Sequence, residues 1–120
     1  MKLNPSCIRD ILLTIEDNSN FNHQTEYHKE KPFESLSNYS HEEIIYHIKQ
    51  CEESNLISDV HYYDGGDNID ILDLTPQGHE FLANIRNDSV WKKVVSKCAG
   101  ASLPVMLTAA KDIALKYFLG

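Results

Sequence analysis

The sequence predicts an α+β fold in which five helices accompany a two-stranded β-ribbon, and the last two helices form a C-terminal extension. Apolar residues recur at helical spacing in five segments, each beginning near a residue type that caps helices. Two β-prone runs flank a glycine-rich turn near the middle of the chain. The 120 residues have the length of one ordinary domain. We therefore expect a ribbon-containing domain over residues 1–88 and a helical extension over residues 89–120.

The first half of the chain predicts two helices separated by a polar segment. Asn4 caps a helix over residues 5–17, and Pro5 occupies its first position. Residues 18–38 form either a long loop or a loop with a short edge strand near Thr25–His28. Ser40, in capping-box spacing with Glu43, begins a second helix that runs to about residue 54. We expect Asn55 to end this helix in the left-handed conformation.

The middle of the chain predicts a hairpin followed by a third helix. Val60–Tyr63 and Ile69–Leu74 are β-prone runs, and the turn between them has the sequence Asp-Gly-Gly-Asp. Thr75 and Pro76 then supply a cap and a first helical residue for a helix over residues 76–86. We expect Gly78 to be structural, because a side chain there would meet the ribbon.

The extension predicts two further helices. Ser89 caps the fourth helix, which ends at Gly100. Its apolar side carries Val90, Trp91, Val94, Val95 and Cys98, and its polar side carries Lys92, Lys93 and Lys97. Ser102 and Pro104 begin the fifth helix. Its apolar stripe repeats every three or four residues and consists of Leu103, Met106, Ala110, Ile113 and Tyr117.

The uncharged stripe of the fifth helix predicts a symmetric homodimer through residues 90–119. Its expected contacts are Trp91 together with the five stripe residues. The alternative is that the stripe folds back on the first helix and completes the core of a short chain. Lys111 and Lys116 are too few to predict binding to a membrane surface.

The composition of the chain predicts its cellular location. The formal net charge is −7; residues 1–85 hold five basic and sixteen acidic side chains, whereas residues 86–120 hold six and two. No apolar run is long enough for a membrane span or a secretory signal. Three widely spaced cysteines form neither a disulfide framework nor a metal-binding pair. We therefore expect a cytoplasmic, reducing location.

The order of elements resembles the winged helix-turn-helix arrangement, in which residues 45–57 correspond to the recognition helix and its turn, and the hairpin corresponds to the wing. Leu74-Thr75-Pro76-Gln77-Gly78 matches that family's Leu-Thr-x-x-Gly string at the exit of the wing. More narrowly, residues 10–16, 46–48, 74–82 and 85–88, together with Trp91, resemble an uncharacterised family of small bacterial and prophage-borne proteins. That family is the domain of unknown function twenty-five thirteen. The resemblance implies a winged helix of mobile-element origin and assigns no activity.

The charge pattern disfavours DNA binding through the wing. No Lys or Arg lies between Lys49 and Arg86, where phosphate contacts are required. We therefore predict a small regulatory or interaction protein that binds a protein partner, host-encoded in the prophage interpretation, through an acidic surface. The expected contacts are Glu42, Tyr46, Lys49 and Glu53 on the second helix and Tyr63, Asp64 and Asp67 on the wing. The alternative is a DNA-binding transcriptional regulator that uses Lys92, Lys93 and Lys97.

The sequence predicts no catalytic, metal or cofactor site. Glu43, His47 and His61 could converge on a metal, but His41 and His47 lie six residues apart, whereas a metalloprotease helix requires His-Glu-x-x-His. Gly65-Gly66 lacks the Lys-Ser/Thr of a phosphate-binding loop, and no Gly-x-Ser-x-Gly occurs. We therefore expect a protein without enzymatic activity.

Overall fold

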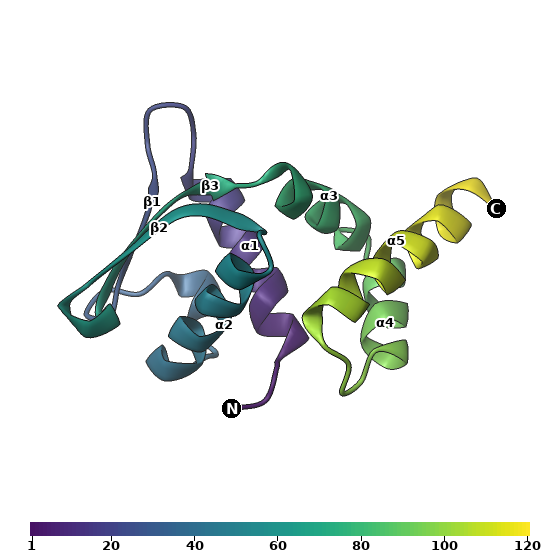
Figure 1. The fold of residues 1–120 in the computed structure, drawn as a ribbon, viewed down its shortest axis with the longest axis horizontal. Helices are drawn as coiled ribbons and strands as arrows, with labels where there is room; N and C mark the ends of the chain where they lie inside the picture. The colour runs from purple at the N-terminus through teal and green to yellow at the C-terminus, as the bar shows by residue number, and fades with distance from the viewer.

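Five helices and one three-stranded antiparallel sheet make up the protein in a computed structural model that describes residues 1–120 (Figure 1). The helices are α1 (Pro5–Asn18), α2 (His41–Glu53), α3 (Pro76–Ile85), α4 (Asp88–Lys97) and α5 (Leu103–Leu119). The strands are β1 (Thr25–His28), β2 (Ile57–Tyr63) and β3 (Asn68–Leu74). The sheet, α1 and α2 occupy one end of the molecule, whereas α4 and α5 occupy the other (Figure 1). None of the helices is long and apolar enough to traverse a bilayer.

The predicted hairpin is present as β2 and β3, but the sheet has three strands instead of two, in the order β1-β3-β2. The edge-strand alternative for residues 25–28 is confirmed, with Thr25 opposite Ile71 and Tyr27 opposite Ile69. The side chains of β1 alternate between buried and exposed, as in a strand with one face against the core. Thr25 and Tyr27 are buried, whereas the intervening Glu26 is exposed. The hairpin strands are also longer than predicted, because β2 begins at residue 57.

The helix starts follow the predicted caps with one exception. Asn4, Ser40, Thr75 and Ser102 each accept a hydrogen bond from a backbone N–H in the first turn of their helix. α4 is capped by Asn87 instead of Ser89, because Asn87 Oδ1 accepts from the amides of Ser89 and Val90 at 2.8 and 3.2 Å. Asn55 ends α2 with φ 58°, as predicted.

The stripe on α5 is buried inside its own chain. Trp91, Leu103, Met106, Ala110 and Ile113 are each at most 9% exposed and belong to one apolar cluster that also contains α1, α2 and the sheet. These five predicted dimer contacts are therefore not available to a second chain. The alternative, in which the stripe packs inside its own chain, is correct. The principal neighbours of α5 are α3 and α4, however, instead of the first helix. Tyr117 and Val95 depart from the prediction, since both are exposed.

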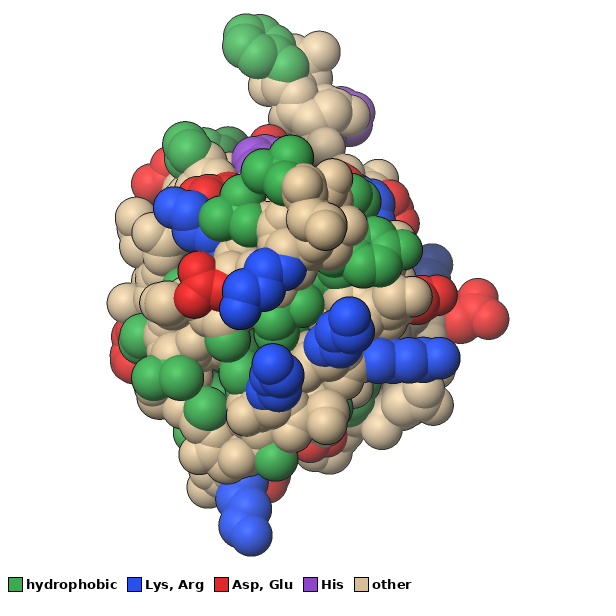
Figure 2. All heavy atoms as spheres, turned by 90° about the vertical axis from the view of Figure 1, so that its right-hand side faces the viewer, with side chains coloured by type: hydrophobic (Ala, Val, Ile, Leu, Met, Phe, Trp, Pro, Cys, Tyr) green, Lys and Arg blue, Asp and Glu red, His purple; other side chains and the backbone are tan.

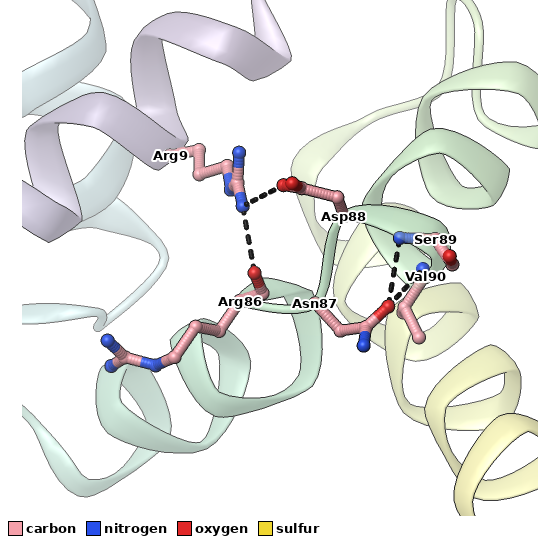
Figure 3. Close-up of polar contacts among 6 residues, drawn as sticks. All are labelled: Arg9, Arg86, Asn87, Asp88, Ser89 and Val90. Carbon is pink, nitrogen blue, oxygen red and sulfur yellow. Dashed lines mark hydrogen bonds and ion pairs between the residues drawn. The ribbon is translucent and has the colours of Figure 1, made fainter.

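Arg9 of α1 joins the extension to the rest of the protein (Figure 3). One terminal nitrogen of its guanidinium donates to the carbonyl of Arg86 at 3.0 Å and to Asp88 Oδ1 at 3.2 Å. The guanidinium also lies 5.3 Å from the centroid of the Trp91 ring. Arg9 thus binds the end of α3 and the beginning of α4, where the predicted boundary between residues 88 and 89 falls.

All three cysteines are buried and unpaired. Burial, followed by the nearby carboxylates of Glu43 and Asp10, raises the pKa of the Cys7 thiol to about 12. Burial likewise raises the pKa of Cys51. These two thiols therefore stay protonated at neutral pH and act as small apolar side chains in the core.

Candidate partner-binding surface

The outer side of α2 carries the four residues predicted from its periodicity. Glu42, Lys49 and Glu53 are exposed, and Tyr46 is half-buried with its ring edge-to-face against His47 at 5.0 Å. The opposite side of the helix is buried by Ile44, His47, Ile48 and Cys51. The prediction that these four residues share an outward-facing side is therefore confirmed.

The turn between β2 and β3 brings the three predicted wing residues to the surface. Tyr63 is 51% exposed, Asp64 is exposed, and the Asp67 side chain is about half exposed. Gly65 and Gly66 adopt φ 68° and 97°, which favour glycine. A Cβ at Gly66 would also lie 3.0 Å from Ile45 Cδ1 of α2, so this turn packs directly against the helix.

Tyr62 forms the first of two links between α2 and the hairpin. Its hydroxyl donates to Glu52 Oε1 at 2.9 Å, and the Lys49 Nζ lies 5.5 Å from the centroid of its ring. Burial, and then the hydrogen bond to Glu52, raise the pKa of Tyr62, so the phenol remains neutral. Lys49 is therefore held against the hairpin and is less free to reach a phosphate than its exposure alone would indicate.

His41 forms the second link. Its Nδ1 is 2.8 Å from the Tyr27 hydroxyl, and the two rings stack with centroids 5.6 Å apart. Its Nε2 lies 3.2 Å from Asp67 Oδ1 in the turn. Although this Tyr-His-Asp order is that of a proton relay, Tyr27 is only 2% exposed, so a substrate has no access to its oxygen. The three side chains instead fix the turn relative to α2.

We call the outer side of α2 together with the turn, namely Glu42, Tyr46, Lys49, Glu53, Tyr63, Asp64 and Asp67, the α2–turn surface. Its carboxylates have no Lys or Arg within ion-pair distance: the ion pairs of the protein are Arg9–Asp88, Arg86–Glu16 and the imidazole contact of His41 with Asp67. Negative charge continues onto the open face of the sheet, where Glu26 lies directly opposite Asp70. Like charges in such a cross-strand pair repel each other.

The lysines of the extension lie at the opposite end of the molecule. Lys92, Lys93, Lys97, Lys111 and Lys116 are all exposed. Figure 2 shows basic side chains gathering on the face at this end of the molecule. The protein is therefore electrically polarised, with its acidic sheet and α2 at one end and its basic helices at the other.

The histidines and acidic side chains form no metal-binding group of three or more. His47 is fully buried; its Nδ1 lies 2.7 Å from the Glu43 carbonyl, and its Nε2 accepts from the Asn4 amide at 2.8 Å. Both ring nitrogens are thus occupied, as expected for a histidine at the border of the core. The Glu43 side chain is also occupied, since its Oε2 accepts from the side-chain Nδ2 of Asn4 at 3.2 Å.

Sequence reasoning missed two exposed or partly exposed aromatic residues near this end of the protein. The sequence places Tyr62 in the hairpin only. Tyr62 follows Val60 by two residues and so lies on the same face of the strand, and this could have indicated a contact with α2. Phe21 is fully exposed in the loop between α1 and β1, which stands out from the body in Figure 1. Its signal was one aromatic residue in a run of polar residues, Asn-Ser-Asn-Phe-Asn-His-Gln.

Comparison with known proteins identifies the family of this chain. Residues 2–104 match the family described as "Hypothetical protein (DUF2513)". An uncharacterised protein of Haemophilus influenzae is 33% identical over 115 residues, which cover 95% of this chain and 92% of that protein. No solved structure matches the chain. The chain belongs to the DUF2513 family.

Proposed function

We propose that this protein is a non-catalytic interaction module that binds a basic protein partner through the α2–turn surface. The observation that carries the proposal is the set of exposed carboxylates on this surface that lack a Lys or Arg partner. A complementary basic surface would neutralise them and would be attracted over a distance of about one Debye length, ~10 Å at 0.1 M salt. Tyr46 and Tyr63 would supply apolar contact area at small entropic cost.

We further propose that the fold is a winged helix, with α2 in the place of the recognition helix and β2–β3 as the wing. The strand order β1-β3-β2 and the helix immediately before the hairpin support this assignment. The element before α2 is only the 3₁₀ turn Glu34–Leu36, which would replace the first helix of the helix-turn-helix. In this geometry α2 would present Glu42 and Glu53 to a major groove, where they would repel phosphate.

A pair of charge-matched variants tests the proposed function. Glu42→Lys/Glu53→Lys changes the charge of the α2–turn surface by +4, and Asp17→Lys/Asp112→Lys makes the same change at exposed sites on α1 and α5. Each protein is used to capture and cross-link partners from a lysate of the cells that encode it, at low and moderate salt.

We expect a salt-sensitive protein complex with the wild type and the control pair, and its loss with Glu42→Lys/Glu53→Lys. Equal capture by both pairs would place the contact elsewhere. The absence of any complex with the wild type would refute the proposal.

Direct binding of DNA is the second candidate function, and the polarised charge favours one form of it. α4 lies at the end of the molecule opposite the sheet and α2 (Figure 1), so its exposed Lys92, Lys93 and Lys97 could meet phosphates without repulsion by the turn. This mode would leave the hairpin unused, unlike a regulator that reads DNA with its wing.

A further inference from the structure

The end of α5 extends beyond the helices on which it packs. α5 has 17 residues, whereas α3 and α4 have 10 each. At a rise of 1.5 Å per residue, α5 is therefore about 10 Å longer than either neighbour. In Figure 1 its C-terminal end accordingly projects away from the rest of the molecule.

This projecting end is strongly apolar. Leu115, Tyr117, Phe118 and Leu119 are 48%, 45%, 60% and 81% exposed. The rings of Tyr117 and Phe118 meet edge to face with centroids 5.0 Å apart, so the two aromatic side chains support each other's position. Leu115, Phe118 and Leu119 are spaced i, i+3 and i+4 and therefore share one side of the helix, and Tyr117 adjoins them through its contact with Phe118. Exposed apolar patches on soluble proteins mark contact sites.

A groove beside this patch runs between α3 and α5. One part of it, of about 270 Å³, is lined mainly by polar residues, with Phe81 and Leu107 as its apolar ones. The next part, of about 260 Å³, is mostly apolar and is lined by Ala114, Leu115, Phe118 and Leu119. Glu80 of α3 and Lys111 of α5 line both parts. These two side chains are exposed and form no ion pair with each other.

We propose that a second copy of this chain occupies the groove, so that two molecules form a symmetric dimer through α3 and the end of α5. The surface is self-complementary because it contains both an apolar projection and a groove whose second part is lined mostly by apolar side chains, which a two-fold axis can pair with each other. The charges on this surface are self-complementary as well. In a two-fold symmetric dimer, Glu80 of each chain lies near Lys111 of the other. Lys116 and Asp112 add one charge of each sign nearby, so the two copies do not repel each other.

The dimer differs from the one that the apolar stripe predicted. The stripe residues Met106, Ala110 and Ile113 remain inside each monomer, and the contacts come from the neighbouring side of α5 and from α3. No contact residue belongs to the α2–turn surface. Failure of the dimer would therefore leave the proposed function intact, and each dimer would display two acidic surfaces.

Sedimentation velocity of the full chain, from about 1 to about 300 µM, tests for micromolar association. We expect a dimer whose dissociation constant rises at least about tenfold in Phe118→Ser, since each substitution occurs twice in the interface. Val105→Ser is the matched control, because Val105 is a similarly exposed apolar residue on α5 outside the groove. It is expected to dimerise like the wild type.

A charge swap identifies the orientation. Glu80→Lys and Lys111→Glu are each expected to weaken their own homodimers, because each creates two like-charge pairs. An equimolar mixture of the two variants is expected to form a heterodimer, in which both pairs are again opposite in charge. A contact within one chain cannot produce this rescue.

Three outcomes would overturn the proposal: a wild type that stays monomeric over the whole range, equal effects of Phe118→Ser and Val105→Ser, or no heterodimer in the mixture. If the monomer instead co-sedimented with phosphatidylglycerol vesicles and Phe118→Ser did not, the apolar end would be a lipid contact.

Discussion

Gly78→Ala is expected to destabilise the protein by more than about 3 kcal/mol, although alanine is the better helix former. A Cβ on residue 78 would lie 2.0 Å from the Leu56 carbonyl oxygen, which also accepts the Thr75 amide at 3.0 Å. Since that oxygen is backbone, relief requires α3 to move away from the segment that connects α2 and β2. Urea denaturation followed by circular dichroism measures the change in unfolding free energy.

The control for this prediction is Ala83→Gly, at an exposed position of the same helix. It reports helix propensity alone and is expected to cost about 1 kcal/mol. One substitution replaces glycine with alanine and the other replaces alanine with glycine, yet we expect both to lower the free energy of unfolding. A Gly78→Ala protein as stable as the wild type would show that α3 does not approach Leu56 so closely.

Met106→Asp is expected to unfold the protein or to cost about 4 kcal/mol or more, because it places an unpaired carboxylate in the core. Met106 is 1% exposed and lies in the interface of α5 with the body of the chain. The measurement is again the free energy of unfolding, together with the fraction of soluble protein after expression.

Val105→Asp is the neighbouring control for this substitution. Val105 is 54% exposed in the first turn of α5, so we expect a change below about 1 kcal/mol. A soluble, folded Met106→Asp monomer would contradict the structure, because it would mean that the stripe is covered by another chain instead of its own.

The helices of this protein were predictable because their signals are local. Apolar periodicity and a capping residue lie within a few residues of each other, as at Asn4 and Thr75. The start of α4 was misplaced because Asn87 and Ser89 are both good caps two residues apart. The sequence leaves β1 undecided between loop and strand, because its signal is only two buried residues and the partner of Thr25, Ile71, lies 46 residues further along the chain.

The residues of the α2–turn surface could be predicted because the helix and the turn that carry them could be predicted. Spacing placed Glu42, Tyr46, Lys49 and Glu53 on one side of α2, and the structure agrees. Spacing could not show the contact of Lys49 with Tyr62, because that contact depends on how the hairpin packs against the helix. The uncharged stripe of α5 was ambiguous for a similar reason: a dimer seam and an internal helix contact have the same sequence pattern.

We infer that the charge of the α2–turn surface keeps this protein from reading DNA with its hairpin. Fluorescence anisotropy of a labelled random duplex, titrated with the wild type at about 50 mM and about 200 mM salt, tests it most directly. We expect no saturable binding at either salt concentration. Binding at low salt that weakens steeply as salt is added, and that a Lys92→Glu/Lys93→Glu/Lys97→Glu variant of α4 retains, would contradict it and would make DNA binding the leading function.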